Sequence, residues 1–286
     1  MNKTDTTLVT VKSGEAPPRG DTDCARLEAM TDEEILAAAQ DDPDAQPLAP
    51  EQLARMRRVS RVKVLRQRLG MTRMEFAQAF QLPVPPLLVI TDRWQAAAPL
   101  PLLAERLFAG GLRWLSLRDK DLPDPERLAL ARDLVRAARP WGATVTLHGE
   151  PELALLAGAA GVHLPDGADA GRARALLGDG ALIGQSVHGP EALARAAGQE
   201  VDYVTVSPVF ASASKPGYGP LLGAEGVRRL AEASPVPLLG LGGIEDAAAA
   251  GACLGAGAAG VAVMGLAMRR PDALAGLLDA VRAAAR

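Results

Sequence analysis

The chain has 286 residues, of which 48% are hydrophobic and only 3% aromatic, and its formal net charge is −3. This composition fits a folded protein with an aliphatic core and excludes a whole-chain nucleic-acid binder, which would be strongly basic. No apolar run is long enough to span a membrane, residues 1–10 lack a secretion-signal pattern, and the two cysteines, Cys24 and Cys253, show no metal-ligand spacing, so we expect a cytoplasmic protein.

The first part of the chain predicts a small helical extension with disordered stretches. Residues 1–22 are polar and contain Gly and Pro, which is typical of a disordered segment. Thr31 followed by Glu34 forms a capping-box pattern, which predicts a short helix from there to about Gln40.

A run of positive charge follows between residues 55 and 73, with no acidic residue inside it. Such a run solvates a helix face or pairs with the acidic residues of the stretch 15–44, and the alternative is contact with a phosphate backbone. The run consists of Arg55, Arg57, Arg58, Arg61, Lys63, Arg66, Arg68 and Arg73.

The same region resembles part of a DNA-binding domain. Residues 62–80 resemble the first two helices of a repressor-type helix-turn-helix domain, and residues 30–56 are similar to the lead-in of small antitoxin-like regulators. The turn at residues 81–83 is followed by Pro85 and Pro86, where a recognition helix would be needed to read bases. We therefore expect a docking or vestigial module in residues 1–85, and no nucleic-acid partner.

From residue 86 onward, short apolar runs alternate regularly with helical segments rich in Ala, Leu and Arg. Eight such pairs within about 200 residues predict an α/β protein, a (β/α)8 TIM barrel over residues 86–286. An open doubly wound sheet is the alternative, but its first strand would be followed by a glycine-rich turn, which is missing here. The predicted strands are Leu87–Thr91, Leu112–Leu117, Thr144–His148, Gly161–Leu164, Leu182–Ser186, Tyr203–Ser207, Leu238–Leu241 and Gly260–Met264.

Glycine-marked turns follow the last two predicted strands. One contains Gly242 and Gly243, and the other begins at Met264 and Gly265. Bare backbone N–H groups at successive strand-to-helix turns can bind an anion, and barrels often hold a substrate phosphate there. These four residues are the predicted phosphate site.

Several barrel motifs together resemble one family, the thiamine-phosphate synthase and TenI (thiazole tautomerase) superfamily. The resemblance covers residues 87–286, in order and with matching spacing. It rests on Leu88–Arg93, Leu117–Lys120, Gly161–Leu164, Ile183–His188, Asp202–Phe210, Ser214–Gly217 and the two glycine turns.

The resemblance implies one of two activities. The synthase joins a pyrimidine diphosphate to a thiazole phosphate with magnesium on the diphosphate, and the tautomerase moves a proton on a thiazole carboxylate phosphate without a metal. The synthase has Gln where this chain has Ser116, Asn-Asp where it has His148-Gly149, and Gly-Gln before an acidic residue where it has Pro165-Asp166-Gly167. Because Gly149 offers no side-chain oxygen for magnesium, the tautomerase is the main expectation, with no required cofactor and no metal ligand.

The expected roles follow from that resemblance and from residue chemistry. His188 would move the proton, because a histidine titrates near neutral pH, the alternative being a structural or idle residue of the barrel mouth. The substrate anion would contact Arg118, Lys120, His148, Ser207 and Lys215, the alternative being that Arg118 and Lys120 pair with Asp119 or Asp121. Asp92 is expected to pair with Arg93, and His163 to be a packed strand residue.

Three functions are weighed for the whole chain. The first is a TenI-like tautomerase, an isomerase with a small phosphorylated thiazole substrate. The second is a thiamine-phosphate synthase, a transferase that would need Mg²⁺ in a rebuilt site. The third is a non-catalytic sensor of a thiamine precursor, and assembly into a homo-oligomer is left open.

Overall fold

The computed structural model describes residues 85–212, 217 and 219–284, together with Met30, Thr31, Glu34 and Ala37. The chain divides into two compact units, Met1–Arg57 and Arg58–Arg286, which are treated separately. None of the helices in the described part has the length and apolar character needed to cross a membrane.

In the first unit, the predicted capping box at Thr31 is confirmed. The Glu34 N–H donates to Thr31 Oγ1 at 3.3 Å, and Glu34 Oε2 accepts from the Thr31 N–H at 2.9 Å. The hydrogen bonds that the Glu34 carboxylate accepts from the Thr31 N–H and from the Thr31 hydroxyl lower its pKa. The helix-turn-helix resemblance of residues 62–80 and the basic run of residues 55–73 lie outside the described residues.

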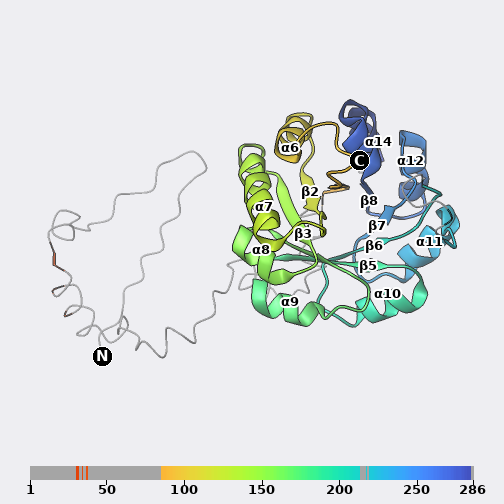
Figure 1. Cartoon of the computed structure of the whole chain (residues 1–286). Coiled ribbons are helices and arrows are strands. Elements are labelled where there is room, and N and C mark those ends of the chain that lie inside the picture. Colours follow the sequence, from red (N-terminus) through yellow and green to blue (C-terminus); the bar gives the residue numbers. More distant parts are fainter. Residues whose placement is uncertain are drawn as a thin grey trace, which may run out of the picture. The chain divides into compact units, whose positions relative to one another are not determined.

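In the second unit, eight parallel strands form a closed barrel, with β1 paired to β8 through Leu88 and Ala262 (Figure 1). The predicted TIM barrel is therefore confirmed. The strands are β1 (Leu87–Ile90), β2 (Trp114–Leu117), β3 (Thr144–His148), β4 (Gly161–Leu164), β5 (Leu182–Val187), β6 (Tyr203–Val206), β7 (Leu238–Leu241) and β8 (Gly260–Val263).

Helices surround the barrel and alternate with the strands. They are α6 (Leu100–Ala109), α7 (Asp124–Ala138), α8 (Pro151–Ala157), α9 (Ala170–Leu177), α10 (Pro190–Ala197), α11 (Gly223–Ala233), α12 (Ala247–Gly255), α13 (Gly265–Arg269) and α14 (Leu274–Ala284), with 3-10 turns η1 (Arg139–Trp141) and η2 (Pro271–Ala273). The second strand begins two residues later than predicted, because residues 110–112 close the end of α6, where the Leu112 N–H donates to the Leu107 carbonyl at 3.0 Å.

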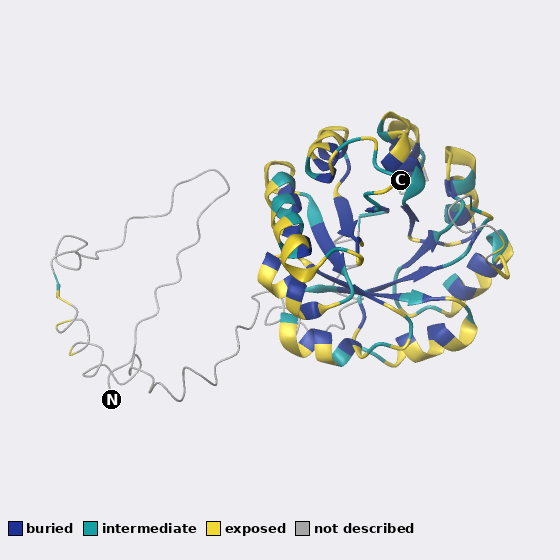
Figure 2. Ribbon diagram, in the orientation of Figure 1, coloured by how far each residue is buried: buried dark blue, intermediate teal, exposed yellow. Residues whose placement is uncertain are grey.

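The core has two layers, because alternate strand residues point to opposite faces of the sheet. Leu87 and Val89 pack outward against the helices, whereas Leu88 and Ile90 point into the barrel. In Figure 2 the barrel strands and the inner faces of the helices are buried, and the exposed residues lie on the outer faces of the helices.

Two aromatic rings fill the barrel interior. Trp114 and Tyr203 meet edge to face with their ring centroids 4.7 Å apart. Gly184 makes room for them, because a Cβ at that position would lie 2.0 Å from the Tyr203 ring. Side chains therefore fill the interior of the barrel, and a ligand-binding site has to lie at one end of it.

Candidate functional site

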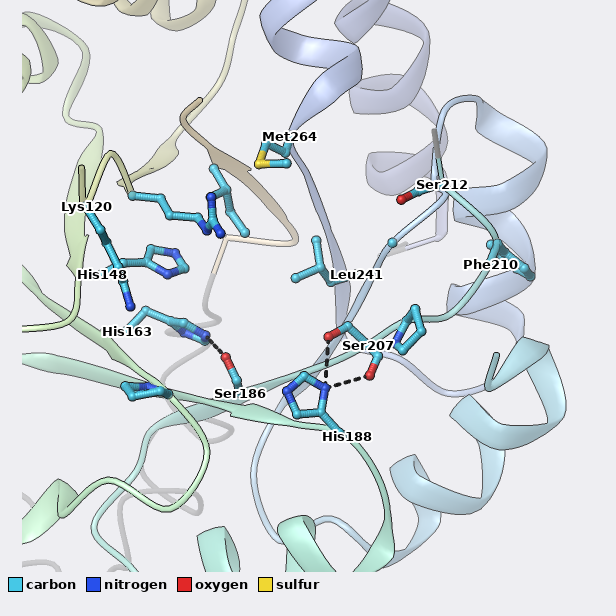
Figure 3. A pocket seen from close by; sticks show the side chains of 15 residues that line it. Lys120, His148, His163, Ser186, His188, Ser207, Phe210, Ser212, Leu241 and Met264 are labelled. Atoms are coloured by element: carbon cyan, nitrogen blue, oxygen red, sulfur yellow. Dashed lines mark hydrogen bonds between the residues drawn. The ribbon is translucent and has the colours of Figure 1, made fainter. Parts of the chain in front are cut away.

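A cavity of about 270 Å³ opens at the carboxyl ends of the strands (Figure 3). This is the end at which the active sites of such barrels lie. Of the residues predicted from the sequence, seven line it: Arg118, Lys120, His148, His188, Ser207, Gly242 and Met264. Gly243 and Gly265 are the chain neighbours of two of these residues, and Lys215 lies outside the described residues.

The cavity wall is cationic. It contains the side chains of Arg118 and Lys120, and no Asp or Glu is among the described residues that line it. A guanidinium and an ammonium group without a carboxylate beside them favour an anionic ligand, such as a phosphate or carboxylate.

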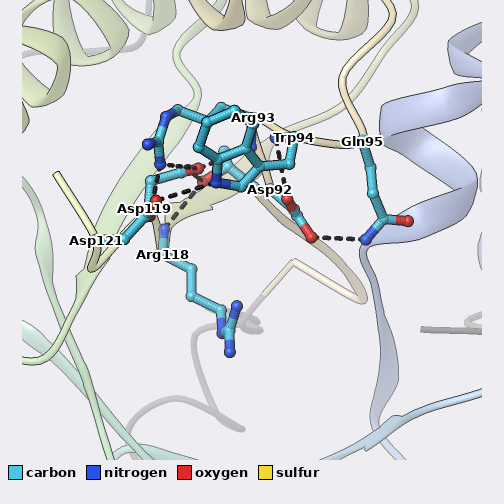
Figure 4. Close-up of polar contacts among 8 residues, drawn as sticks. Asp92, Arg93, Trp94, Gln95, Arg118, Asp119 and Asp121 are labelled. Atoms are coloured by element: carbon cyan, nitrogen blue, oxygen red, sulfur yellow. Dashed lines mark hydrogen bonds and ion pairs between the residues drawn. The ribbon is translucent and has the colours of Figure 1, made fainter. Parts of the chain in front are cut away.

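The nearby carboxylates are engaged elsewhere, which corrects the expected pairing of Asp92 with Arg93. Arg93 instead pairs with Asp121, at 2.5 Å, and stacks over the exposed Trp94 ring (Figure 4). Asp92 accepts hydrogen bonds from the Trp94 N–H and from Gln95. Hydrogen bonds from Arg93 and Trp94 lower the pKa of Asp121 to about 2.

Asp119 is also held by groups other than Arg118. Its carboxylate accepts from Thr91 Oγ1 at 2.5 Å and from the Arg93 N–H at 2.7 Å. Thr91 Oγ1 in turn accepts from the Arg118 N–H at 2.9 Å. These contacts hold the loop after β2. The Arg118 side chain lines the cavity, and it does not make the ion pair with Asp119 or Asp121 that was the alternative prediction.

Two stacked histidines form one wall of the cavity. The rings of His148 and His163 have centroids 4.7 Å apart, and His148 Nε2 is buried without a hydrogen-bond partner in the described structure. Burial, with further contributions from nearby cations, lowers the pKa of His163 to about 3 and that of His148 well below its usual value. Both rings are therefore neutral at physiological pH, and the positive charge of the cavity comes from Arg118 and Lys120.

His163 is more than the packed strand residue expected from the sequence. It is buried, as predicted, but its Nε2 lies 3.0 Å from Ser186 Oγ, and both residues line the cavity. Ser186 was not among the site residues predicted from the sequence, although it lies two residues before His188, which directly follows β5, and residues two apart in extended backbone share one face.

His188 is exposed at the mouth of the cavity, where its ring contacts Ser207 (Figure 3). Its Nδ1 lies 2.9 Å from the Ser207 carbonyl oxygen, an acceptor only, so Nδ1 carries the hydrogen. In the neutral ring Nε2 then holds the lone pair, which is the form needed to accept a proton.

The glycine turn after β7 is built for close backbone approach. Gly242 and Gly243 have φ values of +103° and +66°, and a Cβ on Gly243 would lie 2.4 Å from the Ala211 carbonyl oxygen. Only glycine fits both the left-handed backbone and this spacing. The turn therefore exposes backbone at the cavity, as a phosphate site requires.

The magnesium site of the synthase does not fit the donor set present here. Among the described residues, no three His, Cys, Asp or Glu side chains come together as a metal would require. Asp166, the candidate replacement ligand, instead pairs with Arg195 at 2.9 Å. Magnesium binds hard oxygen ligands, and the described wall of the cavity offers no carboxylate oxygen.

Comparisons with known proteins point to one family. The TMP-TENI family model, described as thiamine monophosphate synthase, matches residues 87–266. A putative thiamine-phosphate synthase from Geobacter sulfurreducens is 42% identical over 65% of this chain and 88% of its own length. A thiamine-phosphate synthase from Myxococcus xanthus is 40% identical over 60% of this chain and 81% of its own.

A solved structure agrees with these relatives. Thiamine phosphate pyrophosphorylase from Pyrococcus furiosus superposes with a TM-score of 0.61 at 25% identity, covering 70% of this chain and 95% of that one. The relatives indicate that the chain is an enzyme, and their names favour a transferase. They support the synthase alternative better than the tautomerase that the sequence analysis put first.

Proposed function

Because this chain belongs to the TMP-TENI family of thiamine monophosphate synthases, we propose that it is a transferase that joins a pyrimidine diphosphate to a thiazole phosphate and releases pyrophosphate. The observation that carries the proposal is the cationic cavity at the carboxyl end of the barrel, lined by Arg118 and Lys120. Both substrates and the leaving group are anions, and this charge is complementary to them.

Each part of the cavity has a distinct task in this proposal. The backbone of the turns at Gly242, Gly243, Met264 and Gly265 binds the thiazole phosphate. Arg118 binds two oxygens of the diphosphate, and Lys120 acts as a point charge beside it. Negative charge grows on the pyrophosphate as it leaves, and cations fixed in place stabilise that charge without reorganising.

In this scheme the side chains of the cavity neutralise the leaving group, and no step is assigned to magnesium. His148 is the last residue of β3 and has a neutral ring, beside Gly149. The contacts that remain for His148 are hydrogen bonds to uncharged or anionic substrate atoms, through its unpartnered Nε2.

Pyrophosphate release tests the proposal. The purified full chain is mixed with both substrates, with magnesium and with chelator, and pyrophosphate is measured. We expect release that requires both substrates, and each substrate alone should raise the melting temperature by mass action. No release at saturating substrate would refute the synthase activity.

A second candidate, the thiazole tautomerase, is favoured by the hydrogen bond that sets the tautomer of His188. With Nδ1 donating to Ser207, Nε2 is the atom that would take a proton from the substrate and return it at another position. Conversion of the thiazole carboxylate phosphate, without pyrophosphate formation and with loss of conversion in His188→Ala, would favour this function. General acid–base catalysis by one residue contributes about 10²- to 10⁴-fold, so that loss would be easily measured.

A further inference from the structure

Below the cavity, Tyr203, His163 and Ser186 on three strands are joined by hydrogen bonds. Trp114 packs against the Tyr203 ring, and its Nε1 donates to Thr146 Oγ1 at 3.2 Å. Tyr203 Oη lies 3.0 Å from His163 Nδ1, and His163 Nε2 lies 3.0 Å from Ser186 Oγ. Trp114, Thr146, His163 and Tyr203 are buried, so water cannot take the place of these contacts.

The buried Tyr203 hydroxyl sets the direction of this chain. Among the hydrogen bonds of the described residues, His163 Nδ1 is the acceptor available to Tyr203 Oη, so Tyr203 donates to Nδ1. The neutral ring then carries its hydrogen on Nε2, and His163 Nε2–H donates to Ser186. In this order His163 both accepts and donates, and such bonds polarise one another and strengthen cooperatively.

The opposite order is less favourable at Tyr203. Tyr203 Oη would then accept from His163 Nδ1, and its own buried hydrogen would have no acceptor among the hydrogen bonds of the described residues. Thr205 Oγ1, 3.2 Å from His163 Nε2, is a second acceptor for that nitrogen in the favoured order.

We propose that this chain is a positioning device, in which Tyr203 and His163 hold the Ser186 hydroxyl with its hydrogen directed into the cavity. Because Ser186 Oγ accepts from His163, its own hydrogen remains for the ligand. The wall at Ser186 therefore selects a substrate with a hydrogen-bond acceptor there, a ring nitrogen or an anionic oxygen. This identification of the substrate atom rests on the proposed function.

The protonation state of His163 supports a fixed tautomer. Burial lowers the pKa of His163 to about 3, so the ring is neutral and one nitrogen alone carries a hydrogen at working pH. The same burial raises the pKa of Tyr203, which keeps its hydroxyl as a donor.

The first test uses the full unmodified chain without ligand. Nitrogen-15 NMR distinguishes the two tautomers of a neutral histidine, and the His163 signal is identified by its loss in His163→Gln. We expect the form with hydrogen on Nε2, also in the control Ser234→Ala, which removes a hydroxyl that bonds the Val236 carbonyl and has no part in the chain. Hydrogen on Nδ1 in the unmodified protein would overturn the proposed direction.

The second test removes single hydroxyls with little change of shape. Tyr203→Phe should abolish the single tautomer and, through one lost hydrogen bond, raise KM for thiazole phosphate about tenfold with kcat nearly unchanged. If Tyr203 acts through Ser186, the double variant Tyr203→Phe/Ser186→Ala should be no worse than Ser186→Ala alone. Additive losses would refute the positioning role. If the unmodified protein does not turn over thiazole phosphate, the proposed function is refuted, and the NMR result for the His163 tautomer then tests the hydrogen-bond chain by itself.

Discussion

At the residue scale, the site depends on which side chains are left for the ligand after the carboxylates have found partners. Asp121 pairs with the Arg93 guanidinium, and Asp166 pairs with Arg195. Asp119 accepts hydrogen bonds from the Arg93 N–H and from Thr91. Arg118 and Lys120 are thereby left as the charges on the cavity wall. Arg118 and Lys120 are the sequence neighbours of Asp119, and this adjacency alone does not indicate that Asp119 is held by other groups.

Replacing Arg118 tests this division of charges. Arg118→Ala should weaken binding of the pyrimidine diphosphate about 10- to 100-fold, since a hydrogen bond to a charged group contributes about 1.5–3 kcal/mol. Calorimetric titration measures the effect. Arg136→Ala is the matched control, because Arg136 pairs with Asp133 on the outer face of α7. Equal dissociation constants for the Arg118 variant and the unmodified protein would show that the guanidinium does not contact the substrate.

At the element scale, two strand-to-helix turns form the proposed phosphate site. The turn after β7 passes close to the chain after β6, and the Val209 N–H donates to the Leu241 carbonyl at 2.9 Å. This close packing of two loops is possible because Gly242 and Gly243 have no side chains. The glycines are therefore needed for the fold of the mouth as well as for ligand access.

Alanine substitutions at two glycines should have opposite effects on stability. Gly243→Ala combines a left-handed backbone with a Cβ placed 2.7 Å from Phe210 Cβ, and should cost about 2–4 kcal/mol of unfolding free energy. Gly251→Ala, inside α12 with no atom within 4 Å of the added Cβ, should instead stabilise by about 0.5–1 kcal/mol. Urea denaturation measures both, and a Gly243 variant as stable as the unmodified protein would mean that the turn relaxes freely.

At the scale of the whole molecule, the barrel buries two neutral histidines that become charged when the chain unfolds. The pKa of His163 falls to about 3, and that of His148 also falls well below its ordinary value. The unfolded chain therefore binds more protons than the folded one between about pH 6.5 and pH 3. Stability rises with pH in this window and is lost as pH falls through it.

Acid should therefore destabilise the barrel before its carboxylates are protonated. Each histidine held neutral costs about 1.4 kcal/mol per pH unit below its unfolded pKa, so the free energy of unfolding should fall by roughly 2–4 kcal/mol between pH 7 and pH 5. Urea titrations at both pH values measure the change. His148→Gln removes one of the two titrating rings and should reduce the slope by about half. A pH-independent stability in this range would mean that the rings are protonated in the folded protein.

The sequence by itself determined the barrel. Alternation of strand and helix fixes a parallel sheet, the number of repeats fixes closure, and the turn glycines mark the phosphate end, because each of these signals is local and periodic. The strands Thr144–His148, Gly161–Leu164 and Leu238–Leu241 are found with the bounds predicted for them.

Only the tertiary structure decided how the polar residues are shared. Three contacts join residues from different strands and loops. Arg93 pairs with Asp121 and not with Asp92, Asp166 pairs with Arg195, and His163 links Tyr203 to Ser186. Sequence spacing does not specify such contacts, because their geometry exists only when the barrel closes and brings distant strand ends around one cavity. The physical reason is that the periodicity of apolar residues encodes which face of a strand is buried, whereas the bonding partner of a polar side chain depends on distances set by the whole sheet.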